Sequence, residues 1–103
     1  MKKVMEILKA EQAKAHKNLE MAQKALDAAR EIEFNLRKAS FDSVKAGDWD
    51  KNDRLNSEIT RAEVESEDAY RKREYACGAA HAIDWVIEQI AWETRVYPEY
   101  DPF

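Results

Sequence analysis

The sequence predicts an all-α protein, and three observations predict it. The chain has 103 residues with only two glycines and two prolines, whereas roughly a dozen of these residues are usual at this length. Apolar and small residues recur every three or four positions over two long stretches, as in amphipathic helices. A short polar segment containing Gly47 separates the stretches. We therefore expect one domain, 1–103, built as a long antiparallel, coiled-coil-like hairpin that pairs with a second copy into a four-helix bundle.

The first helix is expected over residues 2–45. Its opposite, water-facing side carries a charged residue every seven positions at Lys17, Lys24, Glu31 and Lys38. A break near residues 40–43 would instead give a three-helix bundle, which is the alternative fold. The expected buried stripe consists of Met5, Leu8, Ala15, Leu19, Ala22, Leu26, Ala29 and Leu36, widened by Val4, Ala25, Ile32 and Ala39.

A turn is expected at residues 46–52. Gly47 suits the left-handed backbone conformation that closes a helix. Asp50 or Asn52 can cap the following helix, because a side-chain oxygen there accepts a hydrogen bond from a free backbone N–H. The hairpin should therefore reverse direction here.

The second helix is expected over residues 53–96. Pro98 disfavours the helical conformation at Tyr97, so residues 97–103 should form a C-terminal tail. With the turn near residue 48, a residue i of one helix faces approximately residue 97 − i of the other. The expected seam consists of Leu55, Ile59, Ala62, Ser66, Ala69, Arg73, Ala76, Ala80, Ile83, Ile87, Ile90, Thr94 and Tyr97.

The end of the second helix is apolar nearly all round. With Ile59 at heptad position a, Trp85 and Trp92 fall at position f, which points away from the seam. A helix that is apolar all round is normally covered on every side. The cover could be a second copy, the tail 97–103 or a foreign protein, and a homodimer is the preferred reading. The expected interface consists of Gly78, Trp85, Val86, Trp92, Val96 and Tyr97.

Charge is unevenly distributed along the chain. The net charge is −4, and residues 42–68 carry nine acidic against four basic residues. No basic stripe is present, so direct nucleic-acid binding is not expected. The acidic centre could attract a basic partner or mimic nucleic-acid phosphate, but interspersed Lys and Arg favour ordinary solubilising charge. The residues of this acidic surface are Glu58, Glu63, Glu65, Glu67 and Asp68.

One group of side chains could bind a metal ion. Cys77 and His81 lie four residues apart, as do His16 and Glu20, and the two pairs fall at the same level of the expected hairpin. Thiolate, imidazole and carboxylate are all zinc ligands. The favoured alternative is a half-buried thiol with His16 paired to Asp84, because a CxxC doublet is missing from the sequence. No cofactor is therefore expected.

No motif for catalysis is recognisable. The sequence has no nucleophile elbow, phosphate-binding loop or dinucleotide-binding loop. Lone Cys77 requires no oxidising compartment, and Glu6 and Lys9 interrupt the run that would resemble a secretion signal, so a cytoplasmic location is expected. No stretch approaches the roughly 20 apolar residues of a membrane span. We expect a non-catalytic, self-associating interaction module with a protein partner, acting as a small acidic inhibitor or adaptor.

By analogy alone, this module is comparable to the small host-directed proteins of phages. Two alternatives to this function stay open. One alternative is a helical dimer that holds a small ligand or metal between its subunits. The other is an acidic decoy that mimics nucleic-acid phosphate.

Overall fold

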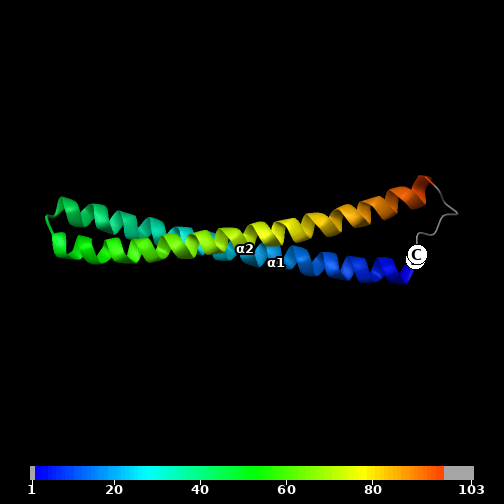
Figure 1. The fold of residues 1–103 in the computed structure, drawn as a ribbon, viewed down its shortest axis with the longest axis horizontal. Helices are drawn as coiled ribbons and strands as arrows, with labels where there is room; N and C mark the ends of the chain where they lie inside the picture. The colour runs from blue at the N-terminus through cyan, green and yellow to red at the C-terminus, as the bar shows by residue number, and fades with distance from the viewer. Residues whose placement is uncertain (1, 97–103) are drawn as a thin grey trace. The chain divides into compact units, whose positions relative to one another are not determined.

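The computed structural model describes residues 2–96 and is all-helical over this range (Figure 1). Helix α1 spans Lys2–Lys45 and helix α2 spans Trp49–Val96, so the predicted helical hairpin is confirmed. α1 runs without interruption through residues 40–43, and the three-helix alternative is therefore wrong. Met1 and the expected tail 97–103, with Tyr97, lie outside the described residues.

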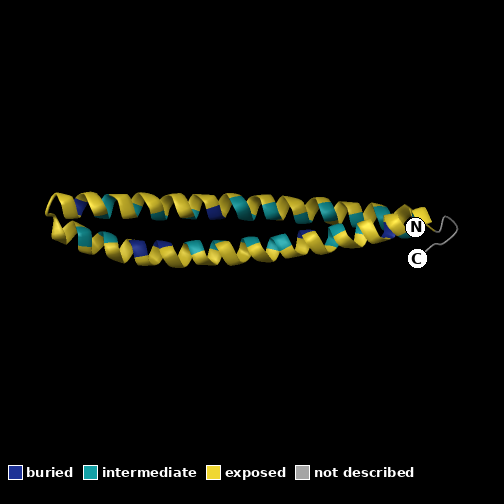
Figure 2. Ribbon diagram, turned by 90° about the horizontal axis from the view of Figure 1, so that it is seen from above, coloured by how far each residue is buried: buried dark blue, intermediate teal, exposed yellow. Residues whose placement is uncertain are grey.

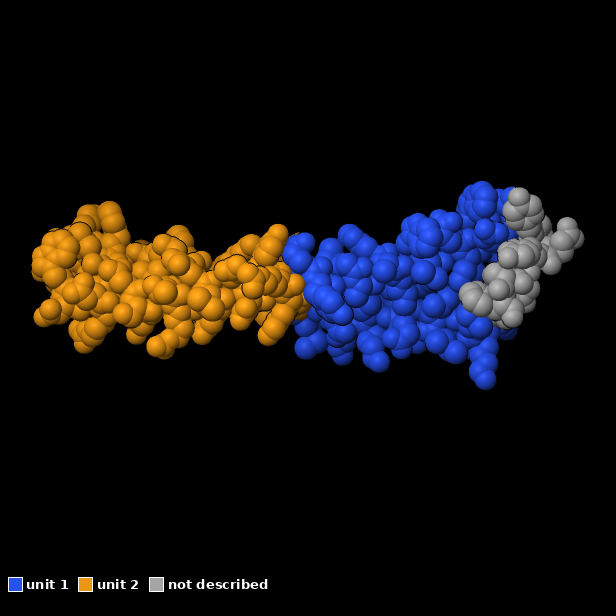
Figure 3. Space-filling model, viewed as in Figure 1, with its two compact units in different colours: residues 1–21, 74–103 blue, residues 22–73 orange. Residues whose placement is uncertain are grey.

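The hairpin divides into two compact units, coloured separately in Figure 3. Unit 1 combines residues 1–21 with 74–103, and unit 2 consists of residues 22–73. Unit 2 contains the turn and the two helical segments that adjoin it, whereas unit 1 contains the start of α1 and the end of α2. Each unit thus packs one segment of α1 against one segment of α2.

The turn in unit 2 is tighter than expected. Gly47 has a φ of 71°, the left-handed conformation predicted for it. The N–H of Gly47 donates to the carbonyl of Val44 at 3.1 Å, and the N–H of Asp48 donates to that of Ser43 at 2.9 Å. These two bonds form a Schellman motif, which satisfies the last carbonyls of α1.

Asp48, rather than Asp50 or Asn52, caps α2, so that part of the prediction is wrong. Its Oδ1 accepts a hydrogen bond from the N–H of Lys51 at 3.1 Å. Because the Schellman motif reverses the chain at Gly47, Asp48 already occupies the N-cap position and α2 begins at Trp49 instead of residue 53. Asn52 lies inside the helix and accepts a hydrogen bond from the hydroxyl of Ser40.

The seam between the helices follows the predicted three-four spacing (Figure 2). Within residues 2–96, every predicted seam position of α2 is buried or half-buried. The same holds for the main stripe of α1, although Ala25 and Ile32, which were expected to widen it, are exposed. The buried positions are Leu26, Ser43, Ile59 and Ala62 in unit 2 and Ala80 and Ile90 in unit 1.

Candidate protein-interaction face

The end of α2 carries a second apolar stripe on its outer side. The residues of this stripe fall on one side of the helix, and every one is exposed. They lie in unit 1. We call this stripe the tryptophan face, and it consists of Tyr75, Gly78, Ala79, Ala82, Trp85, Val86, Trp92 and Val96.

The two indoles dominate the tryptophan face. Trp85 is 62% exposed and Trp92 is 47% exposed, as position f predicts. On the seam side of the same helix, Ile83 and Ile87 are half-buried and Ile90 is buried. α1 therefore covers one side of this helical segment and leaves its other apolar side open to solvent.

Gly78 lies within helix α2, and the described residues give it no packing reason. A Cβ atom built at this position would meet no other atom within 4 Å. Glycine inside a helix costs about 1 kcal/mol relative to alanine. Nothing within the described residues offsets this cost by a close approach to Gly78.

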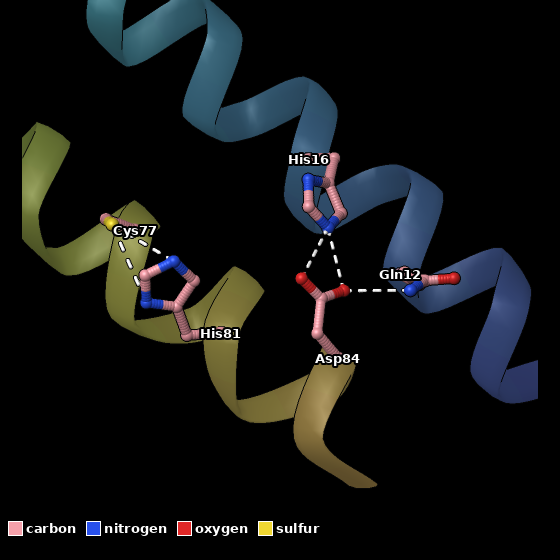
Figure 4. A network of polar contacts seen from close by, with 5 residues as sticks. All are labelled: Gln12, His16, Cys77, His81 and Asp84. Carbon is pink, nitrogen blue, oxygen red and sulfur yellow. Dashed lines mark hydrogen bonds and ion pairs between the residues drawn. The ribbon is translucent and has the colours of Figure 1, made fainter. Parts of the chain in front are cut away.

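A polar cluster joins the two helices of unit 1 near the tryptophan face (Figure 4). Gln12 Nε2 donates a hydrogen bond to Asp84 Oδ1 at 2.8 Å, and His16 Nε2 lies 2.8 Å from the same oxygen. The predicted pairing of His16 with Asp84 is therefore confirmed. The hydrogen bonds from Gln12 and His16 hold the pKa of Asp84 below its ordinary value.

The four candidate metal ligands are not brought together. His16 bonds to Asp84, whereas Cys77 Sγ lies 3.9 Å from Nε2 and 4.0 Å from Nδ1 of His81 (Figure 4). Glu20 has an interaction of its own. Between residues 2 and 96 no three or more His, Cys, Asp or Glu side chains are arranged to hold a metal ion. Helical spacing alone thus placed these residues at one level without making them converge.

Two members of the acidic surface in unit 2 are engaged by arginines. Arg37 Nη2 donates to Glu63 and, at 3.4 Å, to Glu33, and these hydrogen bonds raise the pKa of Arg37 above its ordinary value. Arg71 Nη2 donates to Glu67 at 2.6 Å. Part of the negative charge of this surface is therefore balanced locally, by two arginines that lie outside residues 42–68.

Unit 2 also exposes aromatic residues that sequence reasoning did not select. Phe34 is 67% and Phe41 62% exposed. Phe41 receives the ammonium of Lys45 over its ring at 5.1 Å and, with Val44 and Ile59, lines a groove of about 530 Å³. The seven-residue spacing of Phe34 and Phe41, outside the seam positions, is the signal that could have identified them.

Comparison of the chain with models of protein families, with curated proteins and with solved structures finds no match. Among the described residues, neither helix is long and apolar enough to cross a membrane. What the protein does is therefore inferred from the surfaces of the two units.

Proposed function

We propose that this protein is a non-catalytic protein-interaction module that self-associates as a homodimer through the tryptophan face, and that it acts as a small acidic inhibitor or adaptor. One observation carries the proposal. The end of α2, in unit 1, is apolar both toward α1 and on its outer side, where Trp85 is 62% exposed. A contiguous exposed apolar patch is typical of an interaction site.

The free energy gained by removing aromatic surface from water favours a protein as the occupant. An aromatic side chain that becomes covered removes up to about 150–250 Å² from water, at about 25 cal/mol per Å². Trp85 and Trp92 lie on one helical row, seven residues apart, so one helix laid along this row would cover both. Paired hairpins with apolar faces are a common way to bury such a row.

The test uses a tryptophan that is equally exposed elsewhere. Trp49 lies in unit 2 and is 61% exposed, so Trp49→Glu is matched in chemistry and exposure to a substitution on the tryptophan face. We expect the wild type and Trp49→Glu to sediment as dimers. The double variant Trp85→Glu, Trp92→Glu should sediment as a monomer, with circular dichroism reporting whether it keeps its helices.

A monomeric wild type, or a double variant that stays dimeric, would contradict self-association through this face. A helical monomer would assign the loss to the interface and not to folding. If the double variant loses its helices, the single variants Trp85→Ser and Trp92→Ser repeat the measurement with a milder change.

The acidic decoy is the second candidate, supported by the charge of unit 2. It predicts binding to a basic partner that weakens steeply with salt, because exposed charges are screened beyond about 10 Å at 0.1 M. Replacing the acidic surface with Gln and Asn should then slow association with that partner. An unchanged association rate in this variant, together with a loss in the tryptophan variants, would reject the decoy and support the apolar face. The residues replaced are Glu58, Glu63, Glu65, Glu67 and Asp68.

A further inference from the structure

We infer that the occupant of the tryptophan face is the same face of a second copy, held antiparallel in one register in which facing residues have numbers that add to between 165 and 169. The inference rests on the proposed self-association and adds its geometry. It follows from the order of large, small and charged residues along α2.

Two rows form the centre of the tryptophan face. One row holds Gly78, Trp85 and Trp92. The other holds Tyr75 and Ala82 and continues to Gln89, a polar residue outside the face as defined above, and both rows have seven-residue spacing. When two helices pair antiparallel, each row of one helix packs against the other row of its partner. Facing residues in the centre then add to 167, as 82 and 85 do.

This register places large side chains against small or flat ones. Trp85 of each copy lies against Ala82 of the other, and Trp92 lies against Tyr75. Indole and phenol rings pair favourably when offset or edge to face. Gln89 lies against Gly78, so two of the three kinds of contact pair a larger side chain with a small one, and the third pairs two aromatic rings.

Gly78 has a role in this arrangement that the single chain does not give it. Along the helix, Gly78 lies between Tyr75, which faces Trp92 of the second copy, and Ala82, which faces Trp85 of the second copy. The space around a Cβ at Gly78 is empty in the single chain. In the pair, two indoles from the second copy border that space.

The polar and charged residues beside the tryptophan face select the same register. Glu74, His81, Glu88 and Arg95 follow one another every seven residues along one flank. In an antiparallel pair this flank meets the same flank of the second copy. The register places Glu74 opposite Arg95 and His81 opposite Glu88, with sums of 169.

Other registers bring like charges together. A shift by one heptad places Glu88 opposite Glu88 in one direction and Glu74 opposite Glu88 in the other. Parallel pairing brings Glu88 next to Glu93 of the second copy. Facing like charges are destabilising, and such unfavourable contacts specify one arrangement among several.

Charge exchange between two copies tests the register. Arg95→Glu alone places two pairs of like charges in its homodimer, and Glu74→Arg alone does the same with positive charges. Each should dimerise about tenfold more weakly than wild type. Mixing the two variants restores both attractive contacts, so the mixture should form a heterodimer of near wild-type affinity in sedimentation or native mass spectrometry.

Engineered cysteines give an independent measurement. In a Cys77→Ser background, which removes the chain's one thiol, Ala79→Cys and Val86→Cys are made as separate chains. These positions add to 165 and face each other in the register. The two copies of position 79 lie seven residues, about 10 Å, apart along the paired helices, and so do the two copies of position 86. The mixture should therefore form a disulfide between unlike chains, because a disulfide requires Cβ atoms about 4 Å apart.

The outcomes separate the register from the proposed function. A dimeric wild type with no gain on mixing and no preference for the unlike disulfide would overturn the register and leave self-association standing. A monomeric wild type would overturn both. Restoration on mixing supports the register, since a purely structural role of either residue in its own chain would not be rescued by the other chain.

Discussion

The two units share one seam pattern and differ on the outside. Thirteen of residues 49–73 of α2, in unit 2, are charged, whereas only five of residues 74–96, in unit 1, are. The seam spacing continues unchanged through both segments. Packing against α1 therefore cannot explain the difference, and the outer side of α2 is where the two units are specialised.

The outer side of one helix thus has two different compositions. In unit 2 the outer side of α2 carries charged residues, including the glutamates that pair with Arg37 and Arg71. In unit 1 the same helix presents indoles and small residues. If self-association covers this side, the stability of unit 1 depends on protein concentration, and that of unit 2 does not.

The largest expected effect comes from the core of unit 2. Leu26 is 2% exposed, and Leu26→Ala should lower the free energy of unfolding by about 2–5 kcal/mol through lost burial and a residual cavity. Chemical denaturation at two protein concentrations measures it. The loss should be equal at both concentrations, whereas the loss in Trp85→Ala should grow with concentration. Equal behaviour of the two variants would remove the distinction between the units.

The chain's two glycines give a smaller effect of opposite sign. Gly47→Ala forces a Cβ into a φ of 71°, which should cost about 1–2 kcal/mol of stability. Gly78→Ala removes a helix-interior glycine from open space and should stabilise the dissociated chain by up to about 1 kcal/mol. Thermal denaturation of both variants at a concentration below the dimer dissociation constant makes the comparison. A destabilising Gly78→Ala would show that this glycine has a role within its own chain.

The smallest expected effect is a pH dependence in unit 1. Because its hydrogen bonds lower the pKa of Asp84 in the folded state, Asp84 contributes stability above its unfolded pKa of about 3.9. This contribution disappears as the pH falls through the lowered folded value. The denaturation midpoint of Asp84→Asn should therefore fall less than that of wild type between pH 6 and pH 2. An equal fall in both proteins would count against the polar cluster of Gln12, His16 and Asp84.

The seam could be predicted because it depends on a single period. Apolar and small side chains that recur every three or four residues all lie on one face of a helix. Ile59, Ala80 and Ile90 are buried accordingly. Ile32 was assigned to the seam on its apolar character alone, yet it is 53% exposed. It lies one position before the half-buried Glu33, which continues the heptad row of Leu19 and Leu26, so α1 turns Ile32 toward solvent.

The turn and the site were less predictable, for different reasons. The sequence identified Gly47 but offered Asp50 or Asn52 as the cap, and the geometry of the Schellman motif selects Asp48 instead. The outward position of Trp85 and Trp92 followed from the heptad. Convergence of His16, Glu20, Cys77 and His81 did not follow, since a shared level along two helices leaves side-chain direction open.

The tight turn at Gly47 also determines the order in which the hairpin can assemble. The bond from Ser40 to Asn52 spans 12 residues, whereas that from Gln12 to Asp84 spans 72. Without the contacts between them, closing the longer loop would cost about 1.5 kcal/mol more in chain entropy. We expect pairing to begin at the turn and to advance along the helices, each contact shortening the loop that the next must close. Opening should run in the reverse direction, so hydrogen exchange near Asp84 should be faster than near Ile59 in the dissociated chain.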